Sequence, residues 1–232
     1  MAVRSCKRTI AILLATVTCY STQIGQAQNS RGNVVSKINY IPESSNPMSN
    51  FKKTVATVFW VGEDATAENG FIDNHGSYWD ARWMKNFGGV DTPSDRNGYL
   101  PAGFTPRQNP FYVALPFAEV DHEGNLKEIA KQIPGFGTAN EPLTRNRWVE
   151  VRYKGKSCYA QWQDVGPYEE NDFDWVFGDA KKPKNKYGLK AGLDISPAAA
   201  QFLGIEDSAH TEWRFVDEAG VPGGPWKEIV TR

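Results

Sequence analysis

Two aspartates are the first candidates for chemistry in this chain of 232 residues. Asp164 and Asp194 each stand at the end of an apolar, strand-like run, just before the chain turns. A carboxylic acid in a groove can protonate the oxygen of a glycosidic bond while a second group handles the electrophilic carbon, and inverting hydrolases hold two carboxylates roughly 6.5 to 9.5 Å apart for this purpose. One carboxyl group suffices if it then deprotonates the sugar's own hydroxyl, provided that burial keeps it protonated beforehand.

The same two residues also have a purely structural interpretation. Asp164 begins the sequence Asp-Val-Gly-Pro, and an aspartate at such a turn commonly accepts hydrogen bonds from nearby backbone N–H groups. Asp194 lies two residues before Ser196, where its carboxylate can do the same at the start of a helix. The sequence leaves both interpretations open.

Aromatic residues are the second candidates, because the chain has eight Trp and nine Tyr. Aromatic rings stack on sugars as readily as they fill a protein core. Two aspartates at strand ends are typical of the rim of a groove in a barrel fold. Five tryptophans fall near this expected groove or in residues 63–108, and we expect two or three of them to stack on sugar: Trp60, Trp79, Trp83, Trp162 and Trp175. The residues predicted to contact substrate are Trp60, Trp162, Trp175 and Tyr168.

The other polar residues give weaker indications of a functional site. Asp80 is interpreted as a loop residue, and Asp172 and Asp174 as part of a solvated acidic loop, with a wall of the groove or a divalent-cation site as alternatives. The histidines are far apart and lack ligand spacing, so no metal site is expected: they are His75, His122 and His210. No Gly-x-Ser-x-Gly, phosphate-binding loop or dinucleotide fingerprint is present, so no cofactor is expected.

The elements that must position these residues are short strands. β-Branched and aromatic residues predict strands at 54–62, 111–116, 147–153, 157–163 and 211–216. Ser196 as N-cap, Pro197 in the first turn and Gly204 as the stop predict one short helix. Residues 63–108 show no sustained period and are interpreted as a loop-rich insertion after the first strand. Short strands with one small helix indicate an all-β, closed barrel.

The N-terminus has the pattern of a secretory signal. Three basic residues precede the apolar run 9–17, and small residues lead to a predicted cut after about Ala27. The apolar run is too short to span a membrane, and a lipid anchor at Cys19 is the alternative. Residues 28–53 are polar and predicted to form a flexible leader, which leaves 54–232 as the folded domain. We therefore expect a secreted or periplasmic protein.

Charge and cysteine content narrow the partners. Residues 1–27 contain three of the 26 basic residues and no acidic one, so the remaining 23 Lys and Arg face 27 Asp and Glu. Without a basic stripe to neutralise phosphates, nucleic-acid binding is not expected. Cys158 is then the only cysteine, so no intramolecular disulfide forms, and we interpret it as a buried apolar side chain. The domain is expected to be a monomer.

The order of these segments resembles a known family. The features that carry the resemblance are the first strand with Thr57, a Val-Ala-Leu-Pro at 113–116, Asp-Val-Gly-Pro at 164–167, Leu-Asp-Ile-Ser at 193–196 followed by a helix to Gly204, and the closing strand. Together they are similar to the six-stranded double-psi β-barrels of rare lipoprotein A, bacterial expansins and membrane-bound lytic transglycosylase A. The resemblance covers roughly 54–62 and 110–217.

That resemblance implies action on cell-wall glycan, either peptidoglycan or a plant-type polysaccharide. In the lytic transglycosylases of the group the residue matching Asp164 is the acid and base, whereas in expansins the residue matching Asp194 is essential. Thr57 matches a threonine beside it in expansins, so Thr57 is also predicted to contact substrate. Rare lipoprotein A carries a histidine before its Leu-Pro, and this chain does not.

Three hypotheses follow from the sequence. The first is an exported lytic transglycosylase or glycoside hydrolase that uses Asp164, with Asp194 positioning substrate or acting as second carboxylate. The second is a non-catalytic, expansin-like polysaccharide-binding or wall-loosening module. The third is an inhibitor or adhesion domain that kept only the barrel.

Overall fold

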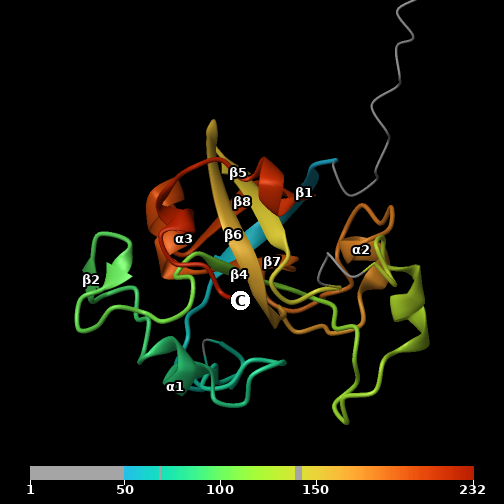
Figure 1. The fold of residues 1–232 in the computed structure, drawn as a ribbon, viewed down its shortest axis with the longest axis horizontal. Coiled ribbons are helices and arrows are strands. Elements are labelled where there is room, and N and C mark those ends of the chain that lie inside the picture. Colours follow the sequence, from blue (N-terminus) through green and yellow to red (C-terminus); the bar gives the residue numbers. More distant parts are fainter. Residues whose placement is uncertain (1–49, 68, 139–142) are drawn as a thin grey trace, which may run out of the picture. The chain divides into compact units, whose positions relative to one another are not determined.

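A computed structural model describes residues 50–67, 69–138 and 143–232. The expected signal at 1–27 and residues 28–49 of the expected leader lie outside these ranges. Six strands form the centre of the fold (Figure 1): β1 (Lys52–Val58), β4 (Tyr112–Leu115), β5 (Trp148–Tyr153), β6 (Lys156–Val165), β7 (Leu193–Ile195) and β8 (Ser208–Val216). The helices are α1 (Trp83–Phe87), α2 (Phe173–Val176) and α3 (Pro197–Leu203), with 3-10 turns η2 (Glu128–Gln132), η3 (Glu218–Gly220) and η4 (Pro225–Lys227).

The six strands close into a barrel in the order β1-β7-β4-β6-β5-β8. β1 pairs parallel with β7, and β4 pairs parallel with β6, whereas the other neighbours are antiparallel. Among the six barrel strands of the described residues, only β5 and β6 are joined by a tight hairpin, with its turn at Lys154 and Gly155. The expectation of an all-β, closed barrel is therefore confirmed. Because the strand order differs from the chain order, neighbouring strands carry residues that are far apart in the sequence.

Aromatic side chains fill the barrel. In β8 the apolar residues alternate with polar ones, so Trp213 and Phe215 point to the same buried face. Phe215 stacks on Phe177 with ring centroids 5.4 Å apart, and Trp162 packs beside both. This dense core fixes the strands that carry Thr57, Asp164 and Asp194.

The helix α3 forms where the sequence predicts it. The Ser196 hydroxyl accepts a hydrogen bond from the N–H of Ala199 at 3.2 Å, and Gly204 ends the helix in the left-handed region at φ 80°. Ser196 also accepts from the N–H of Tyr112 at 3.2 Å, which ties the helix start to β4. One buried hydroxyl thus fixes α3 and the strand beside β7 together.

Residues 63–108 contain α1 and a two-stranded sheet of β2 (Arg96–Asn97) and β3 (Leu100–Pro101). A second buried cluster joins α1 to the barrel: Phe59, Val61, Trp83, Phe87, Tyr112 and Ala114. A buried ion pair of 2.6 Å between Asp91 and Arg96 accompanies it, and the Tyr112 hydroxyl donates to Asp91 at 2.9 Å. These contacts hold the segment against β4.

Some sequence expectations need correction. β1 begins at Lys52, so the strand takes in the last two residues of the predicted leader, and it ends at Val58 rather than Gly62. β6 continues to Val165, which puts Asp164 inside a strand rather than after one. The fold also has α1 and α2 beside the one helix expected, because very short helices lack a sustained sequence period. Among the described residues, no helix is long and apolar enough to cross a membrane.

Candidate functional site

The two aspartates lie in one row of residues across four neighbouring strands. Thr57 of β1 pairs with Asp194 of β7, Asp194 pairs with Ala114 of β4, and Ala114 pairs with Asp164 of β6. Adjacent strands are about 4.8 Å apart, so the Cα atoms of the two aspartates are about 9–10 Å apart. Ala114 lies between the two aspartates in this row.

A β-bulge creates this register. The pairing of β4 with β6 runs Val113 to Trp162 and then Ala114 to Asp164, so Gln163 is the extra residue. Bulges commonly re-aim side chains beside functional sites. Here the bulge places Asp164, rather than Gln163, opposite Ala114.

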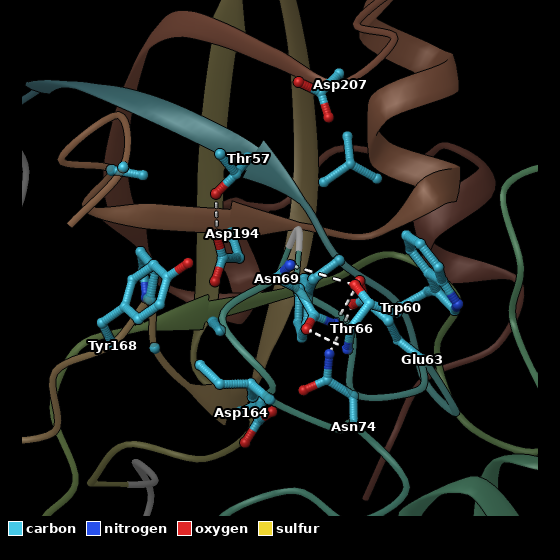
Figure 2. Close-up of a pocket in the computed structure, with 18 of the residues that line it drawn as sticks. Thr57, Trp60, Glu63, Thr66, Asn69, Asn74, Asp164, Tyr168, Asp194 and Asp207 are labelled. Atoms are coloured by element: carbon cyan, nitrogen blue, oxygen red, sulfur yellow. Dashed lines mark hydrogen bonds between the residues drawn. The ribbon is translucent and has the colours of Figure 1, made fainter.

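All four residues of the row line a cavity of about 720 Å³. Its walls are the loop after β1, the turn after β6 and the segment before β7, and Asp207 lies at its edge. In Figure 2, Thr57 and Asp194 lie on the side of the cavity towards Asp207, while Asp164 lies at the opposite end. Tyr168 and Trp60 lie on opposite sides of the cavity in the same view. A cavity of this size accommodates several sugar rings or a compact ligand.

Asp194 is half-buried and accepts a hydrogen bond from the Thr57 hydroxyl (Figure 2). Burial raises the pKa of Asp194 to about 7; the Thr57 hydrogen bond opposes this rise, and the charges of Asp164 and Glu63 add to it. A Cβ at Gly166 would lie 3.5 Å from Asp194 Oδ2, so the turn after β6 approaches this second oxygen. A carboxyl group with a pKa near neutrality can both donate and accept a proton.

Asp164 is 7% exposed, and its Oδ1 accepts hydrogen bonds from the N–H groups of Tyr78 and Val165, both at 2.8 Å. Burial raises the pKa of Asp164 to about 7, and the two backbone hydrogen bonds oppose the rise. Within the described part of the chain, no donor reaches Oδ2. Oδ1 of Asp164 therefore accepts backbone hydrogen bonds, as the structural interpretation predicts. Oδ2 of Asp164 remains available at the cavity.

Glu63 is a third acidic group at the cavity, which the sequence reasoning missed. Its two carboxylate oxygens accept from the side-chain amides of Asn69 at 3.2 Å and Asn74 at 2.9 Å (Figure 2). Burial raises the pKa of Glu63 above its ordinary value, against these hydrogen bonds. Glu63 directly follows Gly62 after an apolar run, and this pattern could have pointed to it.

Exposed apolar side chains gather at the rim. Five of them line the cavity: Ile72, Val90, Tyr168, Tyr187 and Leu189. The rings of Tyr168 and Tyr187 lie 5.4 Å apart and tilted by 42°. Tyr168 has a left-handed backbone at φ 61°, a conformation that costs a non-glycine residue on the order of 1 kcal/mol. The two tyrosines offer an exposed aromatic surface beside the acidic groups.

The structure corrects part of the expected aromatic set. Trp162 and Trp175 are 0% and 1% exposed and do not line the cavity, so they cannot stack on a sugar. The Trp162 indole donates to the Asp164 carbonyl at 2.7 Å, and that of Trp175 donates to Gly192 at 2.9 Å. Both tryptophans support the strands behind the site, because their rings belong to the barrel core.

Of the remaining aromatic candidates, some line the cavity and others do not. Trp83 is buried and Trp79 packs against Trp162, and neither lines the cavity. Trp60 alone of the five tryptophans does so, together with the expected Thr57 and Tyr168. Burial removes Trp83, Trp162 and Trp175 from the set that could stack on sugar, and leaves the partly exposed Trp60 and Trp79. Tyr187, which the sequence reasoning did not select, lines the cavity beside Tyr168.

Asp80 is a loop residue, as expected, because its carboxylate accepts from the N–H of Arg82 and the amide of Asn86. Asp172 is not part of a solvated loop: it is 1% exposed, caps α2 and accepts from the N–H of Lys184 at 2.6 Å. Over the residues that the structure describes, no cluster of His, Cys, Asp and Glu is arranged to hold a metal ion.

Cys158 is buried, and burial raises the pKa of its thiol well above the ordinary value. The interpretation of this residue as a buried apolar side chain is confirmed, because a thiol of this kind is not a nucleophile.

No family model matches the sequence, and neither does any curated protein. Among solved structures the chain is similar to the Streptomyces papain inhibitor, with 16% sequence identity and a TM-score of 0.32. The match covers 74% of this chain and 98% of the inhibitor. A likeness of this strength does not establish a common fold.

Proposed function

We propose that the protein is an exported, monomeric carbohydrate-active protein that binds a cell-wall glycan in the cavity and cleaves it. The observation that carries the proposal is the row from Thr57 to Asp164, which brings two carboxyl groups with pKa values near neutrality to one cavity. The tyrosines at the rim offer a face on which a sugar ring can stack.

The barrel order and its two parallel pairs support the finer assignment to the double-psi class, with 63–108 as an insertion after the first strand. Thr57 donates to Asp194, as the resemblance to expansins implies for a threonine and an aspartate at these positions. This assignment gives the cavity the place of the glycan groove.

The geometry favours Asp194, rather than Asp164, for proton transfer. Asp194 is the more exposed of the two, and one hydroxyl group is its hydrogen-bond donor, whereas Asp164 Oδ1 holds two backbone N–H groups. Protonated Asp194 gives its proton to the glycosidic oxygen as the bond to the anomeric carbon breaks. A hydroxyl group of the same sugar then bonds to that carbon and returns its proton to the carboxylate, which yields an anhydro product without water. Asp164 is the second carboxylate, which stabilises the developing positive charge.

A second candidate function is glycan binding without cleavage, as in expansins. It is favoured by the two backbone hydrogen bonds that occupy Asp164, because a residue that caps a loop need not take part in chemistry. The absence of a histidine before Leu115-Pro116 points the same way.

The test is to incubate residues 28–232 with purified peptidoglycan and, separately, with cellulose or xylan, and to analyse the soluble fragments by mass spectrometry. We expect anhydro products that disappear in Asp194→Asn and persist in Asp217→Asn, an exposed aspartate away from the cavity. Binding to an insoluble glycan without any released fragment would reject cleavage and support the second candidate.

Binding is tested separately with the rim. Tyr187→Ala should weaken glycan binding about three- to tenfold, the range expected for loss of one aromatic contact. Phe71→Ala is the matched control, since this side chain is 74% exposed and does not line the cavity. Equal losses in both variants would place glycan binding elsewhere.

A further inference from the structure

The charged side chains that line the cavity are all acidic. Five carboxyl groups belong to its walls: Glu63, Asp64, Asp164, Asp194 and Asp207. Among the described residues, no Lys, Arg or His lines the cavity. A cleft lined by one sign of charge attracts ligands of the opposite sign. The walls therefore favour a ligand that carries positive charge.

The buried carboxyl groups elsewhere in the described residues have cationic partners. Three of them lie within ion-pair distance of an Arg or Lys, at 2.6, 2.7 and 3.9 Å: Asp91 with Arg96, Glu150 with Arg214, and Asp172 with Lys184.

Glu63 and Asp164 are buried to a similar degree, at 9% and 7% exposed, but neither has such a partner within the described part of the chain. Their donors are side-chain amides and backbone N–H groups, which are all neutral. Because buried charges in proteins are normally paired, these two carboxyl groups have a vacancy that the fold itself does not fill. A cation bound in the cavity would supply the missing partner.

Glu63 is the better placed of the two to hold a cation without entering the reaction. Asn69 fixes its carboxylate, because the Asn69 amide also donates to the Asp64 carbonyl at 2.9 Å and its oxygen accepts from the N–H of Thr66 at 2.9 Å. Each oxygen of Glu63 accepts one amide hydrogen, and a carboxylate oxygen has a second lone pair for another donor. In Figure 2, Glu63 lies on the side of the cavity opposite Tyr168.

A sugar can bring positive charge to this place through an amino group. An unacetylated amino sugar carries an ammonium group with three N–H donors, whereas acetylation leaves one neutral amide N–H and adds bulk. A glycan that stacks on the tyrosine rim and crosses the cavity meets Glu63 on the far side. Asp207, which is exposed and has no side-chain partner among the described residues, adds negative charge at the edge.

We propose that Glu63, assisted by Asp207, makes the cavity selective for glycans with free amino groups over the same glycans in N-acetylated form. This inference rests on the proposed function, because it assigns the substrate class of the same cavity.

The experiment measures dissociation constants of residues 28–232 at about pH 7, where an amine of this kind is protonated. The ligands are a β-linked glucosamine oligomer, its N-acetylated form of the same length, and oligolysine of matched charge. The wild-type chain should bind the glucosamine oligomer at least about tenfold more tightly than the acetylated one. High salt should reduce this difference. Oligolysine should bind more weakly than the glucosamine oligomer, because it has no sugar ring to stack on the tyrosines.

Glu63→Gln tests the buried carboxylate. Its amide oxygen can still accept from Asn69, and its NH₂ group can donate to the Asn74 oxygen after rotation of that amide, so the loop keeps its hydrogen bonds. This variant should bind the glucosamine oligomer about tenfold more weakly and the acetylated oligomer as the wild type does.

Asp207→Asn tests the same inference at an exposed position where the fold does not depend on the side chain. It should weaken binding of the glucosamine oligomer about two- to fivefold. Glu206→Gln is the matched control, because this neighbouring carboxylate is exposed and does not line the cavity. We expect it to change binding less than twofold.

Four results would overturn the inference. Equal wild-type affinity for the free and acetylated oligomers would reject selectivity while leaving glycan binding intact. Wild-type affinity in Glu63→Gln, together with equal losses in Asp207→Asn and Glu206→Gln, would reduce the preference to a general charge effect. Tighter binding of oligolysine than of either glycan would assign the cavity to a basic peptide and reject the proposed function as well. Binding of none of the three ligands would also reject both.

Discussion

At the scale of single residues, one pair of substitutions separates the structural role of Asp164 from the catalytic role proposed for it. In Asp164→Asn, the amide oxygen can still accept from the N–H groups of Tyr78 and Val165, but the ionisable proton is gone. We expect this variant to fold normally and to release glycan fragments at least about 100-fold more slowly if Asp164 takes part in the reaction. Asp164→Ala leaves both N–H groups without their acceptor and should lower the free energy of unfolding by a further 1–3 kcal/mol or so.

Thermal and urea unfolding of both variants measure the structural role, and fragment release measures the chemical one. Equal stability of the Asn and Ala variants would show that the backbone hydrogen bonds contribute little. Full activity in Asp164→Asn would remove Asp164 from the reaction.

The hydrogen bond from Thr57 to Asp194 sets a second prediction. A donor to the charged carboxylate lowers its pKa, so Thr57→Val should raise the pKa of Asp194 above its value of about 7. If Asp194 is the acid, activity persists to higher pH in this variant, and the alkaline limb moves up by about half a unit to one unit. The Asp194 carboxyl signal in an NMR titration reports the same shift without reference to activity.

Thr57→Ser is the control, because it keeps the hydroxyl group and should leave the titration unchanged. A titration of Thr57→Val that coincides with that of the wild type would mean that the hydrogen bond does not tune Asp194.

At the scale of elements, the start of α3 supports the site from behind. The Ser196 hydroxyl is fully buried and accepts from the N–H groups of Ala199 and Tyr112. Ser196→Ala should lower the free energy of unfolding by about 1–3 kcal/mol, since it removes a helix cap and leaves a buried N–H of β4 without a partner. Urea unfolding checks this value against Ser94→Ala, an exposed serine whose side-chain contact is Thr92. A loss no larger than that of the control would contradict the cap's role.

The elements also show what sequence reasoning can and cannot reach. The helix α3 and the β5–β6 hairpin were predictable because their signals are local: a Ser-Pro start, a Gly stop and a Lys-Gly turn. The alternation of residues in β6 predicts two faces for the strand, but it does not say which face points into a closed barrel. The sequence therefore predicts Trp162 at the groove, whereas in the structure it lies in the core. Glu63 and Tyr187 come from loops separated by more than 100 residues, and only the closed barrel brings them to one cavity.

At the scale of the whole molecule, buried carboxyl groups tie stability to pH. Burial raises the pKa of Asp91 to about 6 and those of Asp164 and Asp194 to about 7, whereas the unfolded chain titrates these groups near pH 4. Between about pH 4 and pH 7 the native state therefore holds more protons than the unfolded state. The free energy of unfolding must then fall as the pH rises through this window, because each step to higher pH favours the state that has already released its protons.

We expect the free energy of unfolding, measured in urea by tryptophan fluorescence, to be lower at pH 8 than at pH 5 by at least about 2 kcal/mol. The double variant Asp164→Asn/Asp194→Asn should flatten most of this profile and be the more stable protein at pH 8, because it no longer buries two negative charges. Asp91→Asn is not an equivalent change, since it leaves the buried Arg96 guanidinium without its carboxylate and should destabilise the fold at every pH. If the free energy of unfolding of the wild type instead rises from pH 5 to pH 8, these carboxyl groups are ionised without cost in the native state. The cavity would then lack the protonated carboxyl group that the proposed route of glycan cleavage requires.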